Sequence, residues 1–397
     1  MKKIIFILVI FLIVLAESRG QKQAGNNGII TVDVTKSYSQ KKELILQDFM
    51  DVEYISLETN DDFVNQGLVM DIGKKIIIVT NRQVRNGDIF IYDRTGKALR
   101  KINRKGLSSE EYTNFLDIIL DEDNNEMYVN EPFKRKILVY DLYGKFKRSF
   151  PYKGDGQFYT ELFNYDRDNL ICCDKYNKGY SFVLLSKKDG SIVKEIKIPF
   201  KKKILLEQRL YIQEKTDKAN TVAATLHVAS PSSSNQIFYD TGNWMLLEHS
   251  SDTVYSFLSD YSLRPSLVRT PPIQSMDPGV FLRSIFFHDR YIFMETVKNV
   301  YDFKRKTGFP ETFFLYDKQE KNFFGYTIYN GDYSTKKEIY INYLRTVNYE
   351  IGSWQSLEAY QLVEDYKKGI LKGKLKEIAA KLDEDDNPVI MLIKHKK

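Results

Sequence analysis

The sequence predicts an all-β protein whose single folded domain, residues 21–397, is a six-bladed β-propeller with a C-terminal helix and a closing strand. Three observations lead to this expectation. A strand–turn–strand pattern recurs along the chain, and each copy belongs to a unit of four predicted strands. Tyr (27 residues) and Phe (25 residues) are abundant, which suits pleated, half-buried surfaces. Units of four antiparallel strands at intervals of roughly 40–50 residues are typical of propeller blades, whereas a β-sandwich has about seven strands in total.

The first twenty residues are typical of a cleaved secretory signal peptide. Lys2 and Lys3 precede an unbroken apolar run, residues 4–15, and small residues lead up to Gly20. The run is too short to span a bilayer, which needs about 20 apolar residues. No cysteine near the cleavage site offers a point for lipid attachment. We therefore expect a periplasmic or secreted protein that does not span a membrane.

The clearest copies of the repeat are residues 89–102 and 137–150, which begin 48 residues apart. In both, a strand ending in Tyr-Asp is followed by a turn that contains glycine and by a second strand. The Asp side chain can accept hydrogen bonds from the backbone ahead of it, and Gly supplies the positive φ of a tight hairpin. Weaker copies cover residues 182–193, 252–263 and 313–324. A further pair of predicted strands precedes each hairpin, so five units can be recognised directly.

A sixth unit can be assembled from the two ends of the chain. Its predicted parts are residues 52–57, residues 339–349 and the closing strand, residues 388–394. Between the last two, residues 356–382 predict an amphipathic helix that begins at Ser356. Such a helix could bind a membrane surface, but packing against the propeller rim is the expected role.

Residues 203–234 are predicted to be an insertion between blades, partly helical and ending in a serine-rich loop. Insertions on repeat scaffolds often lie over the binding face. We therefore expect this segment to contribute to ligand specificity.

No residue pattern predicts a catalytic, metal-binding or cofactor site. Nucleophile motifs, P-loops and dinucleotide fingerprints are lacking, and the four histidines are scattered. Residues 121–132 partly resemble a calcium loop, but Glu126 replaces the required glycine and Pro132 the final glutamate, so a turn between strands is expected. The formal charge of +6 is dispersed along the chain, which disfavours nucleic-acid binding.

The two cysteines, Cys172 and Cys173, are adjacent. Successive side chains of a strand point to opposite faces. Two buried free thiols are therefore favoured over the alternative, a strained vicinal disulfide that acts as a redox switch.

The chain resembles the six-bladed β-propellers of NHL-repeat type found in exported proteins of gut Bacteroidetes. The resemblance lies in the Tyr-Asp-x-x-Gly-Lys hairpins and in residues 52–59, 252–255 and 386–390. Members usually carry a Gly-x-Gly-Pro-Gly-Glu-Tyr loop after the first hairpin, and here only Gly106, Glu111 and Tyr112 match it. The resemblance implies Glu111 and Tyr112 as candidates for ligand contact. It implies no common activity.

These observations favour a non-catalytic binding or scaffold protein. We expect a monomer without a cofactor, whose ligand, a glycan or a peptide, binds one face of the disc near the central channel. The alternative is a metal-dependent hydrolase or lyase whose acidic residues converge on that channel.

Overall fold

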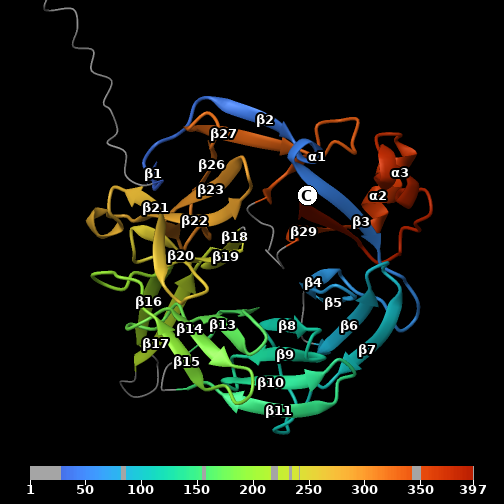
Figure 1. Cartoon of the computed structure of the whole chain (residues 1–397), viewed down its shortest axis with the longest axis horizontal. Helices are drawn as coiled ribbons and strands as arrows, with labels where there is room; N and C mark the ends of the chain where they lie inside the picture. Colours follow the sequence, from blue (N-terminus) through green and yellow to red (C-terminus); the bar gives the residue numbers. More distant parts are fainter. Residues whose placement is uncertain are drawn as a thin grey trace, which may run out of the picture.

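The computed structural model describes residues 28–81, 86–153, 158–215, 222–231, 235–240, 242–341 and 350–396. The predicted signal peptide, residues 1–20, lies outside these ranges. Within them, five sheets of four or more strands are arranged around a central axis like the blades of a propeller (Figure 1). The expectation of an all-β propeller is confirmed at this level.

Three blades are four-stranded antiparallel meanders. The first contains β4 (Leu68–Ile72), β5 (Ile76–Thr80), β6 (Asp88–Asp93) and β7 (Ala98–Asn103). The second contains β8 (Asp117–Asp121), β9 (Glu126–Glu131), β10 (Lys136–Asp141) and β11 (Phe146–Pro151). The third contains β12 (Glu161–Asn164), β13 (Asn169–Cys173), β14 (Phe182–Ser186) and β15 (Ile192–Ile196).

The fourth and fifth blades each gain an N-terminal strand on their outer edge. The fourth contains β18 (Ile237–Asp240), β19 (Asn243–Leu247), β20 (Thr253–Phe257) and β21 (Leu263–Thr270), with β1 (Ile30–Asp33) parallel to β21. The fifth contains β22 (Val280–Phe287), β23 (Tyr291–Lys298), β26 (Glu311–Asp317) and β27 (Asn322–Tyr329), with β2 (Lys41–Ile45) parallel to β27 and a short β28 (Glu338–Ile339). Small elements accompany them: α1 (Leu46–Phe49), the 3-10 turn η3 (Ile273–Ser275), and the pair β24 (Tyr301–Asp302) and β25 (Thr307–Gly308).

The predicted count of six blades is not supported. A further sheet has three strands in the order β29 (Ile351–Leu357), β30 (Val389–His395) and β3 (Met50–Ser56). The physical reason is that β1 and β2 extend the outer edges of blades that are already complete, so that only β3 is left to join the C-terminal strands. Most of the predicted strand at 339–349 falls at residues 342–349, outside the described part of the chain.

The last strand joins the two ends of the chain. β30 lies between β29 and β3 and pairs antiparallel with both. Its pairing with β3 runs from Met50 opposite His395 to Ser56 opposite Val389. Residues 389–393 of β30 are fully buried. A central, buried strand of this kind contributes to stability through both its ladders and its side chains.

The hairpins that define the repeat are held as the residues predict. Asp93 Oδ1 accepts hydrogen bonds from the backbone amides of Thr95 (2.8 Å) and Lys97 (3.1 Å) between β6 and β7. Gly96 has φ +88°, and an added Cβ would lie 2.0 Å from the carbonyl oxygen of Ser56 in β3. Glycine is therefore required there both by the turn and by the approach of the neighbouring sheet.

Apolar clusters fill the spaces between adjacent sheets, and the two cysteines belong to different clusters. Cys172 packs with residues of the second and third blades, and Cys173 with residues of the third and fourth. Both are free and fully buried. Burial raises the pKa of both thiols well above its ordinary value, which keeps them protonated and unreactive.

The prediction of one continuous C-terminal helix is wrong. Two short helices, α2 (Ala359–Lys367) and α3 (Gly373–Ala379), replace it. Gly369 has φ +69° and ends α2 in a Schellman motif, in which the Gly369 amide binds the Tyr366 carbonyl and the Ile370 amide binds the Asp365 carbonyl. Side chains of both helices pack in the core cluster beside β3 and β30, as expected for a rim position.

The insertion also differs from its prediction. Residues 203–234 contain a two-stranded hairpin, β16 (Gln208–Lys215) and β17 (Val222–Ala229), in place of the expected partly helical segment. The β-branched and aromatic residues of these strands favour extended backbone over helix.

Candidate functional site

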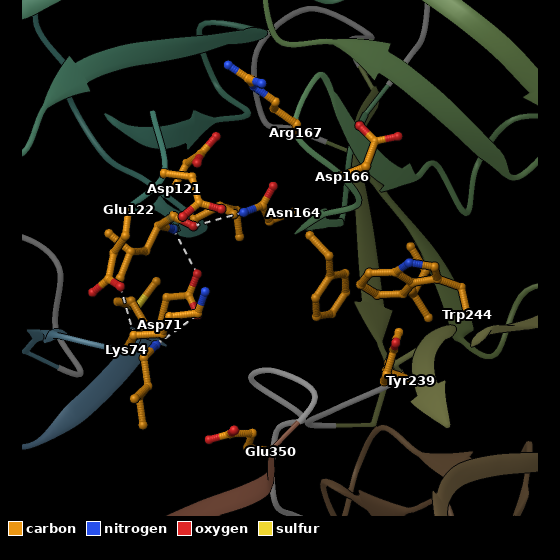
Figure 2. A pocket seen from close by; sticks show the side chains of 18 of the residues that line it. Asp71, Lys74, Asp121, Glu122, Asn164, Asp166, Arg167, Tyr239, Trp244 and Glu350 are labelled. Atoms are coloured by element: carbon orange, nitrogen blue, oxygen red, sulfur yellow. Dashed lines mark hydrogen bonds between the residues drawn. The ribbon is translucent and has the colours of Figure 1, made fainter. Parts of the chain in front are cut away.

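A cavity of about 340 Å³ lies where the inner strands of four blades end. It is lined from the ends of β4, β8 and β12, from β18, and from the turns that follow the first three. The inner strands of neighbouring blades contact one another here, β4 with β8 and β8 with β12. The cavity therefore marks one mouth of the central channel, and Figure 2 shows its lining.

One wall of the cavity is aromatic. Trp244, at the start of β19, is 9% exposed and packs edge-on against Tyr239 of β18, with ring centroids 5.2 Å apart. Phe163 of β12 lies against the same indole at 5.7 Å. The three rings belong to the apolar cluster between the third and fourth blades, which fixes their orientation. They give the cavity a rigid apolar surface.

The opposite wall carries carboxylates that are anchored by backbone amides. The two carboxylate oxygens of Glu122 accept hydrogen bonds from the amides of residues 74–76 in the preceding blade, at 2.8–3.0 Å. Asp71 Oδ2 accepts one from the Leu120 amide at 2.7 Å. An added Cβ on Gly73 would lie 2.3 Å from Glu122 Oε1, so glycine permits this approach. These bonds tie the first two blades together and hold both carboxylates in place.

A buried lysine holds two polar side chains that line the cavity. The ammonium group of Lys187, a residue 4% exposed, donates to Asp121 Oδ2 (2.7 Å), to Asn164 Oδ1 (2.5 Å) and to the carbonyl of Asp166 (2.6 Å). Its side chain reaches from the third blade to the end of β8 in the second. These hydrogen bonds from Lys187 fix the positions of the Asp121 and Asn164 side chains.

Charged side chains of both signs line the cavity. Among the residues that the structure describes, six carboxylates line it, Asp71, Asp121, Glu122, Asp123, Asp166 and Glu350, together with three cationic side chains, Lys74, Arg94 and Arg167. Asp121 is paired with the buried Lys187.

The candidates taken from the family resemblance lie elsewhere. Glu111 and Tyr112 belong to the connection between β7 and β8, and neither lines the cavity. Glu111 Oε2 accepts the Ser108 amide at 3.0 Å, and Tyr112, fully buried, donates its hydroxyl to the Gly87 carbonyl at 2.6 Å. These bonds assign both residues a structural role in their loop, and contact with a ligand stays a prediction.

The described residues of the inserted segment do not line this cavity. The reason is that the connection from β15 to β18 joins the opposite ends of the strands. Lys203, at its start, forms a nearly buried ion pair with Glu248 (2.8 Å). This ion pair ties the start of the segment to the end of β19.

Residues 121–126 form the turn between β8 and β9, as expected, but Asp121 and Glu122 also line the cavity. Their role was missed because a single repeat shows only a polar turn. A signal was present in the alignment of the repeats, since Asp71, Glu122 and Asn164 all stand at or beside the end of a first strand. In the described ranges, no group of three or more His, Cys, Asp or Glu side chains is placed to hold a metal ion.

The chain belongs to the family described as Domain of unknown function (DUF4934). The family model matches residues 29–394. No curated protein matches the sequence. Across the parts that the structure describes, no helix is long and apolar enough to cross a membrane.

Several solved structures are similar to this DUF4934 chain. One is the structure of a Bacteroides fragilis protein that is named for its expected export. It superposes with a TM-score of 0.54 at 14% identity, over 93% of this chain and 99% of that one. A DUF4221 member from Bacteroides vulgatus gives 0.45 at 8%, over 88% and 99%. A streptogramin B lyase gives 0.34 at 11%, over 72% and 93%. At such identities the first likeness shows the fold alone, and the two lower scores carry no argument.

Proposed function

We propose that this protein is an exported, non-catalytic binding protein that recognises a glycan at the channel mouth. The observation that supports this most directly is the pairing of an aromatic wall, Phe163, Tyr239 and Trp244, with a wall of anchored polar groups across a cavity of about 340 Å³. A sugar ring has an apolar face and a rim of hydroxyl groups. The apolar face suits the rings, and the hydroxyl groups suit the carboxylates and Asn164.

The site is rigid before a ligand enters, which supports a binding function. The aromatic rings are fixed by the cluster between blades, and Glu122 is fixed by three backbone amides. A preorganised site loses little conformational entropy when a ligand enters. We include in the proposal that the protein is a monomer and needs no cofactor.

The chain offers a direct spectroscopic test, because it contains only two tryptophans. In a Trp354→Phe background, Trp244 is the remaining tryptophan, and its emission can be excited selectively. A glycan that enters the cavity should change its emission and raise the melting temperature by mass action. Trp244→Leu should abolish the thermal shift, whereas Phe133→Ala, at an aromatic residue that is 74% exposed and outside the cavity, should leave it unchanged.

The same assay separates the alternatives. If a peptide library shifts the melting temperature through Trp244 and a glycan library does not, the ligand is a peptide. If a library member is turned over in a reaction that EDTA stops and a divalent cation restores, the protein is a metal-dependent hydrolase or lyase, and the proposal is wrong.

Export is part of the proposal. It is supported by the sequence of residues 1–20 and by the similarity in fold to a protein named for export. N-terminal sequencing of the native protein should show a mature chain that begins after Ser18 or Gly20. An intact Met1 in the membrane fraction would contradict export.

We also propose that β29, β30 and β3 are the outer three strands of a sixth blade of NHL type. This is supported by their meander order and by the buried central position of β30. An experimental structure with a further strand on the inner side of β29 would bear this out. A closed ring of five blades in which β29 forms a free edge would rule it out.

A further inference from the structure

The aromatic wall of the cavity continues outward between the third and fourth blades. Tyr165, in the turn after β12, has its ring centroid 6.0 Å from that of Trp244 and 6.4 Å from that of Tyr261. Tyr261 stands in the turn between β20 and β21, and its ring stacks with Phe257 at a centroid distance of 5.9 Å and an interplanar angle of 18°. The rings therefore form a continuous path away from the channel mouth.

Tyr261 lies on the same face of the disc as the cavity. The cavity is lined from β18, and β20 runs in the same direction as β18 because both pair antiparallel with β19. The end of β20 and the turn after it therefore lie on the side of the cavity. Within this blade the strands follow the order β18, β19, β20, β21, so the path leads from the channel toward the outer edge.

The backbone at Tyr261 has a conformation that tyrosine rarely adopts. Its φ is +65°, and the same position of the corresponding turn holds Gly96 (φ +88°) in the first blade and Gly144 (φ +84°) in the second. In all three turns the amide of this residue binds the carbonyl three positions earlier, and the amide of that earlier residue binds the carbonyl of the residue that follows. Bulky residues in this region are uncommon and gather at functional sites. A tyrosine where the turn favours glycine indicates a role for its ring.

The ring of Tyr261 is presented to solvent in a defined position. Tyr261 is 37% exposed, whereas Phe257, with which it stacks, is 1% exposed. Asp260 Oδ1 fixes the turn by accepting hydrogen bonds from the amide (2.9 Å) and the hydroxyl (2.6 Å) of Ser262. The ammonium group of Lys194, from β15 in the third blade, lies 5.5 Å from the centroid of the Tyr261 ring. An aromatic surface with a hydrogen-bond donor beside it suits a sugar ring.

Resting on the glycan-binding function proposed above, we propose that Tyr165 and Tyr261 form a second sugar subsite, so that the ligand is a linear oligosaccharide. One end of the chain occupies the cavity beside Trp244, and further sugar rings lie along the two tyrosines toward the outer edge of the disc. A sugar that fits within the cavity gains nothing from Tyr261, because Tyr261 does not line the cavity. A longer chain gains an additional aromatic contact.

Chain length and one substitution provide the test. We would titrate the protein by calorimetry with linear oligosaccharides of glucose, xylose, mannose and galactose, each as a disaccharide and as a hexasaccharide. In a series that binds, the hexasaccharide should bind more tightly than the disaccharide. Tyr261→Gly should weaken the hexasaccharide about fivefold to tenfold and leave the disaccharide unchanged. Because the turn favours glycine at this position, the variant should unfold cooperatively with a melting temperature close to that of the wild type.

Tyr143 provides a matched control. It stands directly before Gly144 in the corresponding turn of the second blade and is 69% exposed, with the Arg100 guanidinium 4.2 Å from its ring centroid. Neither Tyr143 nor Arg100 lines the cavity. Tyr143→Ala removes an exposed aromatic ring from the same kind of turn, and it should leave the affinity for both chain lengths unchanged.

The outcomes distinguish this inference from the function on which it rests. If Trp244→Leu abolishes binding of the hexasaccharide and Tyr261→Gly leaves it unchanged, glycan binding at the cavity stands and the second subsite is wrong. If Tyr261→Gly weakens disaccharide and hexasaccharide alike, Tyr261 acts through the cavity wall, and the second subsite is again wrong. If no member of any series binds, both proposals fail.

Discussion

His249 should make the free energy of unfolding of this protein depend on pH between about 6.5 and 4. The residue follows β19, is 7% exposed, and packs edge-on against Phe281 with ring centroids 5.7 Å apart. Its buried Nε2 has no hydrogen-bond partner. Burial lowers its pKa to about 4, against the attraction of the neighbouring Glu248 carboxylate.

The direction and size of the effect follow from proton linkage. In the unfolded chain, His249 takes up a proton as the pH falls below about 6.5, whereas in the fold it stays neutral until about pH 4. The unfolded chain binds more protons in this interval, so the free energy of unfolding decreases as the pH falls. At about 1.4 kcal/mol per pKa unit, the full effect is about 3 kcal/mol, of which about 2 kcal/mol should be lost between about pH 7 and pH 4.5.

Urea denaturation followed by fluorescence measures this loss. We would compare the wild type with His249→Phe, which removes the titrating group and keeps an aromatic ring, at several values from about pH 7 to about pH 4.5. The free energy of unfolding of the wild type should fall by about 2 kcal/mol more than that of the variant. His227→Phe, at an exposed histidine of β17, should behave like the wild type. Parallel pH dependence in wild type and His249→Phe would refute the reasoning.

Three further predictions concern the framework. Lys187→Met should destabilise the fold by about 3–5 kcal/mol, because it leaves the buried Asp121 carboxylate without its cation; an unchanged urea midpoint would contradict this. Burial would raise the pKa of Glu126, but hydrogen bonds led by that from Arg148 lower it to about 2. Glu126 should thus stabilise the protein above about pH 4.5 and lose this effect as the pH falls toward 2, and Glu126→Gln should remove that dependence from urea curves. Deleting residues 387–397 removes β30 and should abolish cooperative thermal unfolding; a truncated chain that melts like the full one would show otherwise.

Much of the fold could be predicted because its determinants are local. The hairpins at residues 89–102 and 137–150 are β6–β7 and β10–β11, and each is defined by an Asp and a Gly within a few residues of one another. The separation of Cys172 and Cys173 onto opposite faces follows from the alternation of a single strand.

Other features depend on partners that are distant in the sequence. β1 and β2 pair in parallel with β21 and β27, which lie more than 200 residues away in the sequence. The residues of the helix 356–382 predict one helix, whereas Gly369 adopts a positive φ and two helices pack beside β3. For β1 and β2 the deciding energy comes from pairing with a distant sheet. The break between α2 and α3 follows from the local glycine cap at Gly369.

The sequence by itself determined the blade as a unit, the turns within it and the export signal that we propose, because each of these depends on residues close together in the chain. Only the tertiary structure decided the candidate site. Its aromatic and acidic walls come from four blades, and the backbone amides that hold Glu122 belong to residues almost 50 positions earlier. A polar turn in one blade becomes part of a charged cavity only when closure of the sheets around the axis brings the inner strands together.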